Sequence, residues 1–222
     1  MPTFGFSAFL KLISLNVRPQ RTLVRQRLLA TRSAGYDFHR SLKLRANQYL
    51  VDGVPLPEVL LTAEDIARAP ERRSAKTGLE RLGIWRVLNA GPILSFEPVL
   101  FESPAKNFKV QFLPNFGIRL GGETLAVHIW NTAKTDLDIR MTYAALSLFP
   151  ALYADEKAQP DDIAVLSLPN SRLYRLSEVE DQTEVGRRLV RRLDDLFEEI
   201  RREPTKPNAP PKGRPVTPPS AR

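Results

Sequence analysis

Basic side chains near the start of the chain are spaced so that helices would gather them on common faces. Arg18, Arg21 and Arg25 follow an i, i+3, i+7 spacing, and Arg40 and Lys43 are three residues apart. Guanidinium groups carry a fixed charge and present their donors in a fork that fits phosphate oxygens. The sequence therefore predicts a nucleic-acid-binding surface on two neighbouring helices, made of Arg18, Arg21, Arg25, Arg40, Lys43 and Arg45.

Charge is distributed unevenly along the 222 residues, which carry a net charge of +8. Residues 1–51 hold nine basic side chains and one acidic side chain, whereas residues 91–203 hold 14 basic and 18 acidic ones. This contrast leaves two alternatives to ligand binding: the basic faces could simply be solvated, or they could dock onto the acidic middle of the same chain. Under the binding hypothesis, Arg21→Ala combined with Arg25→Ala weakens a salt-sensitive interaction with DNA, RNA or an acidic protein partner.

The composition excludes several catalytic chemistries. The chain has no cysteine and only two histidines, His39 and His128, which excludes a thiol nucleophile, a disulfide framework and a cysteine-based zinc site. The sequence contains none of the motifs G-x-x-x-x-G-K-[ST], G-x-G-x-x-G, G-x-S-x-G or H-E-x-x-H. We accordingly predict no cofactor and no metal.

A β-hairpin is the clearest local structure in the sequence. Residues 116–120 and 123–130 are joined by Gly121-Gly122, whose glycines supply the positive φ values that a two-residue turn requires. Counting outward from the turn fixes the register and gives one apolar face and one polar, mixed face. The mixed face places Asn115 opposite His128, with Trp130 following His128 on the same face, and these three are candidate site residues.

Periodicity along the chain predicts an α+β protein in three parts. Residues 1–69 are interpreted as a basic helical region, and residues 70–203 as a mixed-sheet α/β domain in the order helix, three strands, helix, two strands, helix. Residues 204–222 contain seven prolines and no acidic residue, so we predict a disordered, basic, proline-rich tail. The main helices are expected at 21–30, 36–51, 70–88, 137–154 and 181–203, and the strands at 93–101, 107–112, 116–120, 123–130, 163–168 and 172–176.

The element order over residues 70–176 resembles the core of the restriction-endonuclease-like, or PD-(D/E)XK, superfamily. In that superfamily an Asp on the second core strand and a Glu-x-Lys on the third bind a divalent metal and activate water. The hairpin looks like these two strands, with Asn115 at the Asp position and His128-Ile129-Trp130 at the Glu-x-Lys positions. Because Mg²⁺ is held through hard carboxylate ligands, the resemblance implies a catalytically degenerate core. Without the resemblance, Asn115 and His128 are an ordinary surface or packing pair.

The predicted helix at 181–203 has a narrow apolar stripe between charged flanks, and Asp181 with Glu184 resembles a capping box. The stripe either lies on the sheet domain or pairs with a second copy, which would make a homodimer through 181–203. No apolar run reaches the roughly 18 residues of a membrane-spanning helix. We therefore expect a cytoplasmic protein without a membrane anchor.

Together these features predict a non-enzymatic binding protein that engages nucleic acid or an acidic partner through its basic N-terminal helical surface. Two alternatives remain open at this point. The first is a divalent-metal-dependent nuclease with an atypical site around His128. The second is an adaptor or assembly subunit that uses the amphipathic helix at 181–203.

Overall fold

The computed structural model describes residues 1–29, 38–132, 137–154 and 156–203, and these form the α+β fold that the sequence predicts. The predicted disordered tail, 204–222, lies outside the described residues. The helices are α1 (Phe6–Ile13), α2 (Val17–Leu29), α3 (Arg40–Leu50), α4 (Leu56–Thr62), α5 (Ala69–Leu88), α6 (Ile139–Leu146) and α7 (Thr183–Arg202). The strands are β1 (Thr3–Gly5), β2 (Ile93–Leu94), β3 (Val99–Glu102), β4 (Lys109–Phe112), β5 (Phe116–Leu120), β6 (Glu123–Trp130), β7 (Asp162–Ser167) and β8 (Arg172–Arg175). Short 3₁₀ helices occupy Ala63–Asp65 (η1), Pro150–Tyr153 (η2) and Leu176–Glu178 (η3).

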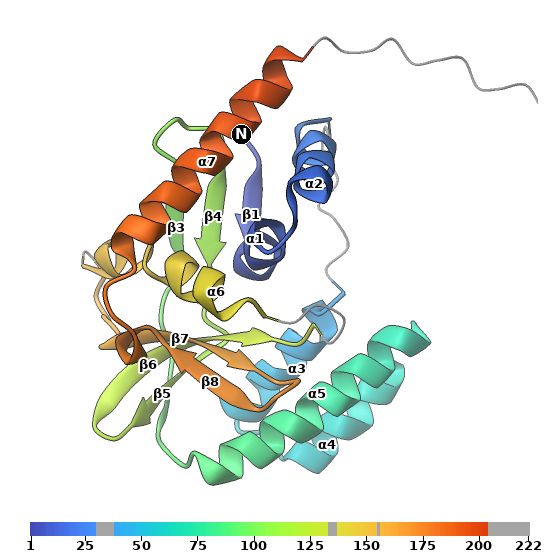
Figure 1. The fold of residues 1–222 in the computed structure, drawn as a ribbon. Coiled ribbons are helices and arrows are strands. Elements are labelled where there is room, and N and C mark those ends of the chain that lie inside the picture. The colour runs from blue at the N-terminus through green and yellow to red at the C-terminus, as the bar shows by residue number, and fades with distance from the viewer. Residues whose placement is uncertain (30–37, 133–136, 155, 204–222) are drawn as a thin grey trace, which may run out of the picture.

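Five strands form the larger sheet, in the order β2-β5-β6-β7-β8 (Figure 1). Neighbouring strands are antiparallel except β6 and β7, which are parallel because the chain crosses over through α6 between them. The predicted hairpin register is confirmed, since Ile118 pairs with Leu125 and the pairing continues in step from the turn. Gly121 and Gly122 have φ values of 58° and 89°, which a residue with a Cβ adopts only at a steric cost.

One face of the large sheet is covered by α3, α4 and α5. The 3.6-residue spacing of α5 buries Leu79, Leu82 and Trp85 against this face, and the Trp85 ring lies 5.8 Å from the Phe116 ring. These side chains belong to one buried cluster with strand residues such as Val127. The predicted helix at 70–88 and the predicted apolar sheet face are therefore confirmed, while α4 has no counterpart among the predicted helices.

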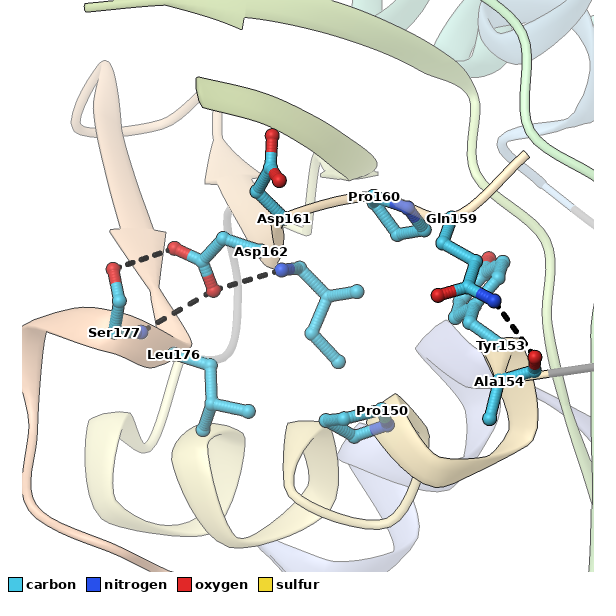
Figure 2. A pocket seen from close by; sticks show the side chains of 10 residues that line it. Pro150, Tyr153, Ala154, Gln159, Pro160, Asp161, Asp162, Leu176 and Ser177 are labelled. Carbon is cyan, nitrogen blue, oxygen red and sulfur yellow. Dashed lines mark hydrogen bonds between the residues drawn. The ribbon is translucent and has the colours of Figure 1, made fainter. Parts of the chain in front are cut away.

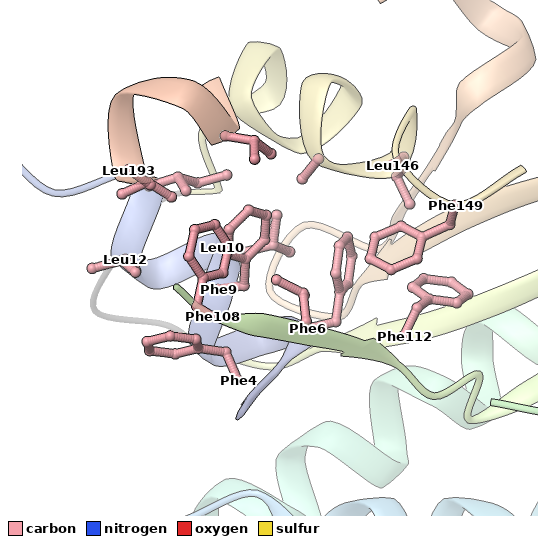
Figure 3. Packing of buried hydrophobic residues seen from close by; sticks show 14 of the residues in the cluster. Phe4, Phe6, Phe9, Leu10, Leu12, Phe108, Phe112, Leu146, Phe149 and Leu193 are labelled. Atoms are coloured by element: carbon pink, nitrogen blue, oxygen red, sulfur yellow. The ribbon is translucent and has the colours of Figure 1, made fainter. Parts of the chain in front are cut away.

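The opposite face of the large sheet packs against α6 and a smaller, three-stranded sheet of order β1-β4-β3. Aromatic rings dominate this second cluster, which also takes in α1 and α7 (Figure 3). Phe108 on the segment leading into β4 is fully buried, and Phe197 on α7 stacks on it with the ring centroids 5.3 Å apart. Phe4 on β1 meets both rings edge-on at 6.3 Å. Segments from both ends of the described chain thus close the same core.

This second face corrects one prediction. We expected it to be polar and mixed, but Ala126, His128 and Trp130 are each at most 3% exposed. The layer that covers them comes from residues 3–13 and 99–112, which are distant in sequence from β6. Alternation along a strand indicates which side chains share a face of the sheet. It does not indicate whether a segment distant in sequence covers and buries that face.

The predicted strand at 93–101 is instead two strands in different sheets. β2 pairs with β5, whereas β3 pairs with β4. Pro98, just before β3, lacks the N–H that a continuous ladder would need. Phe96 crosses over Gly117 so closely that a Cβ at Gly117 would lie 2.5 Å from its ring.

The N-terminal region also differs from the prediction of a purely helical segment. β1 pairs in parallel with β4, and α1 follows it directly. Residues 3–13 therefore share a core with β4 and α7, both of which lie in the range 70–203 that we expected to form the sheet domain. Among the described residues, no helix is long and apolar enough to cross a membrane.

The last two helices begin near the predicted positions. α7 starts at Thr183 with Gln182 at its N-cap, and no side chain caps it there, so the predicted capping box is wrong. Instead, Asp181 Oδ1 accepts a hydrogen bond from Thr183 N at 2.8 Å. α6 ends at Leu146, well before the predicted end at 154, and a 3₁₀ turn follows from Pro150.

Candidate functional site

His128 is held between β6 and α1 in largely aromatic surroundings. Its Nδ1 lies 3.2 Å from the carbonyl oxygen of Leu113, and its Nε2 lies 2.7 Å from Ser7 Oγ. Because a carbonyl oxygen can only accept, Nδ1 donates to Leu113, and Nε2 shares a hydrogen bond with the Ser7 hydroxyl. The Phe6 ring meets the imidazole edge-on at 5.2 Å. His128 is therefore a buried polar side chain that links the large sheet by hydrogen bonds to α1 and to the segment between β4 and β5.

Asn115 and Trp130 also have structural partners of their own. The backbone N–H of Asn115 donates to the Val127 carbonyl at 2.8 Å, and Asn115 Oδ1 accepts from Ile129 N at 2.7 Å. The side chain therefore extends the hydrogen bonding between β5 and β6 beyond the last ladder pair. Trp130 is 3% exposed and lies in the aromatic core. The three candidate site residues are thus used for packing and for pairing of strands.

The part of the chain that the structure describes contains no group of three or more histidine, aspartate or glutamate side chains that could hold a metal ion. The buried Asp162 is engaged elsewhere, because it accepts from Ser177 Oγ at 2.7 Å and pairs with Arg175 Nε at 3.1 Å. The nuclease alternative therefore gains no support from the described residues.

Two of the predicted binding arginines on α2 are paired with the end of α7. Arg21 Nη1 lies 2.6 Å from Glu199 Oε2, and both Arg21 and Arg25 contact the carboxylate of Glu203. Hydrogen bonds from Arg25 and then Arg21 lower the pKa of Glu203, and those to Glu199 and Glu203 raise the pKa of Arg21. Arg21 and Arg25 are therefore docked onto acidic residues of the same chain, which is one of the two alternatives to ligand binding.

The lowered pKa of Glu203 predicts an acid-sensitive contact between α2 and α7. A carboxylate with a depressed folded-state pKa adds stability that is present above its ordinary value near 4.5 and is lost as the pH falls through the folded-state value. Amide shifts of α2 residues, followed by NMR, are expected to move below that pH. Glu203→Gln should abolish this transition and leave the spectrum of α5 unchanged. A transition that persists in Glu203→Gln would assign the effect to another group.

The remaining predicted binding residues lie in different surroundings. Arg18 and Arg40 are exposed and Lys43 is half-buried, whereas Arg45 Nη2 donates to the Thr62 carbonyl at 2.5 Å. α2 contributes to the aromatic core and α3 to the core on the other side of the large sheet (Figure 1). The two basic faces therefore belong to different layers of the fold.

A second group of basic residues, which the sequence reasoning missed, lies on the first half of α7. We call Arg187, Arg188, Arg191 and Arg192 the α7 arginine row. The side chains of Arg187, Arg188 and Arg191 are 67%, 69% and 63% exposed, and Arg192 is also exposed. The first three share the carboxylate of Glu184, with the nearest N···O distance at 2.8 Å for Arg191.

The row is on the side of α7 that faces away from the core. Helical spacing places it opposite Leu193, Phe197 and Ile200, which are buried in the aromatic cluster. The apolar stripe predicted for this helix is therefore covered by the chain's own core. That burial removes the observation on which a homodimer through 181–203 rested.

Comparison with known proteins does not identify a family for this chain. No family model matches the chain, and no curated protein matches it. Among solved structures, the crystal structure of SSO0001 aligns with 14% sequence identity over 85% of this chain and 84% of that chain, with a TM-score of 0.34.

Proposed function

We propose that this protein binds nucleic acid through the α7 arginine row. The observation that carries the proposal is the exposure of four arginines within two helical turns, three of which share the one carboxylate group of Glu184. Such a row keeps an excess of positive charge at the surface, whereas Arg21 and Arg25 are neutralised by Glu199 and Glu203.

Exposed guanidinium groups suit a phosphate backbone for two reasons. They donate in a planar fork to phosphate oxygens, and each phosphate that they neutralise releases condensed counterions. The second half of α7 carries Asp195, Glu198 and Glu199, which would repel a polyanion. The favourable contact is therefore expected on residues 187–192, with Arg18 and Arg40 as further exposed cations.

The resemblance to the restriction-endonuclease-like core fits the same proposal. A core that carries Asn115 and His128 at the signature positions would keep the binding role of that superfamily without its metal chemistry. The proposal assigns His128 a packing role and no catalytic step. It extends to a cytoplasmic location, since a chain without cysteine suits a reducing compartment.

Neutralising the row should weaken binding strongly. A variant with Arg187, Arg188, Arg191 and Arg192 all changed to Gln is expected to bind labelled duplex DNA or single-stranded RNA about 10- to 100-fold more weakly at low salt. The steepness of log K against log salt should fall by about 3 to 4, because each of four lost phosphate contacts removes slightly less than one unit. Fluorescence anisotropy over a salt series measures both quantities.

Two control variants make this test specific. Arg73, Arg119, Arg140 and Lys157 are exposed cations on other elements, so changing all four to Gln removes the same charge without touching the row. Arg21→Ala with Arg25→Ala removes arginines that are already paired. Both controls should retain most of the affinity. Equal losses in the two fourfold variants, or a salt-insensitive wild type, would contradict the proposal.

A further inference from the structure

An apolar groove with an acidic rim lies beside the start of α7. Its first pocket has a volume of about 340 Å³, and its apolar floor is made of Pro150, Tyr153 and Leu176 (Figure 2) together with Ile163. A second pocket of about 310 Å³ shares Pro150 and Leu176 in its wall and continues to Thr183, the first residue of α7. The two pockets therefore adjoin each other along η2 and η3, and we call the pair the groove.

The charge of the groove has one sign. Its acidic residues are Asp161 and Asp162 in the first pocket and Glu180 and Asp181 in the second. Among the described residues that line the two pockets there is no lysine, arginine or histidine. Asp162 is buried, bonded to Ser177 and paired with Arg175, so the negative charge of the groove rests on the other three carboxylates, which are exposed. Such a groove favours an occupant that is cationic and carries compact apolar side chains.

Two of these exposed acids, Asp161 and Asp181, have hydrogen bonds that favour their ionised form. Hydrogen bonds from the backbone and side chain of Thr124 lower the pKa of Asp161, and hydrogen bonds from Thr183 lower that of Asp181. Burial, in contrast, raises the pKa of the Tyr153 hydroxyl, which stays neutral and donates to the Glu97 carbonyl at 3.2 Å. The rim is therefore negative while the floor is uncharged.

We propose that residues 204–222 of the same chain dock in this groove. This segment holds seven prolines, four basic residues and no acidic residue, so it matches both the apolar floor and the negative rim. Proline loses little conformational freedom on binding, which favours shallow apolar sites of this kind. A matching segment that is covalently attached also binds at a high effective concentration.

The chain is long enough for this docking. α7 begins at the groove and spans 20 residues, so its far end lies about 30 Å away at 1.5 Å per residue. The 19 residues of 204–222 cover up to about 59 Å at the polyproline rise of 3.1 Å per residue. The segment can therefore turn back after Glu203, run along α7 and still place several residues in the groove.

A paramagnetic label on the full chain tests the docking. Since the chain has no cysteine, Ser220→Cys gives a single site for a nitroxide. Amide signals of residues 176–182 are expected to broaden selectively at low salt, and those of α5 to stay sharp. Raising the salt concentration should restore the broadened signals, because the attraction is between exposed charges.

Neutral isosteres on the rim provide the matched variant. Asp161→Asn, Glu180→Gln and Asp181→Asn together should abolish the broadening, while Asp52→Asn, Glu58→Gln and Glu80→Gln, at exposed acids away from the groove and α7, should not. The amide spectrum of each variant shows whether the fold is kept. Broadening that survives rim neutralisation, that spreads over the whole surface, or that arises only between labelled and unlabelled copies would overturn the proposal. None of these readouts involves nucleic acid, so the outcome is independent of the α7 arginine row.

Discussion

Phe108→Ala is expected to lower the free energy of unfolding by about 3–5 kcal/mol. Phe108 is fully buried, and its ring contacts Phe4, Phe9 and Phe197 from three different elements. Removing it leaves a cavity that these rings cannot fill without moving β1, α1 or α7. Denaturant unfolding followed by circular dichroism measures the change in midpoint at constant slope.

Leu100→Ala is the control for this prediction. Leu100 lies on β3, next to β4 in the small sheet, but it is 47% exposed. Leu100→Ala should lower the free energy of unfolding much less than Phe108→Ala does, since little buried volume is lost. A loss of less than about 1 kcal/mol in Phe108→Ala would show that the small sheet is not part of the cooperative core.

Asp194→Ala is expected to destabilise the protein by about 2–4 kcal/mol, although aspartate on a charged helix is usually a surface residue. Its carboxylate is 5% exposed and accepts hydrogen bonds from Ser103 Oγ at 2.8 Å and from Ala105 N at 3.3 Å. This contact fastens α7 to the turn between β3 and β4. Truncation leaves the buried Ser103 hydroxyl without its acceptor.

The neighbouring residue gives a matched control for Asp194. Asp195 is exposed and has the same charge, so Asp195→Ala should change the unfolding free energy by less than about 0.5 kcal/mol. Asp194→Asn keeps one acceptor oxygen and should fall between the two. Equal effects of Asp194→Ala and Asp195→Ala would mean that helix charge, and not the buried hydrogen bonds, determines the loss.

Local signals predicted much of the fold. The register of β5 and β6 followed from Gly121-Gly122, because a two-residue turn leaves no freedom in the pairing. α5 followed from its apolar spacing. β1 did not, because a three-residue strand that pairs in parallel with β4, more than 100 residues later, has no local signature. The break between β2 and β3 was missed because Pro98 lies within a largely apolar run that is typical of a single strand.

The candidate site was less accessible to sequence reasoning, for two physical reasons. Whether an arginine is available depends on its partners, and Glu199 and Glu203 come from a helix almost 180 residues away from Arg21. Counting charge over residues 91–203 gave a net negative sum that hid the α7 arginine row. Charge counted per helix face would have found it.

The division of the fold into two cores has a consequence for how the chain folds as it is synthesised. The core around α5 uses residues between Leu42 and Leu168, so it can form before α7 has been made. The aromatic core requires both α1 and α7, so it can be completed only after α7 has been synthesised. Until then Phe4, Phe6 and Phe9 have no complete site in which to be buried. We expect the nascent chain to be most vulnerable to aggregation, and most dependent on chaperones, in this interval.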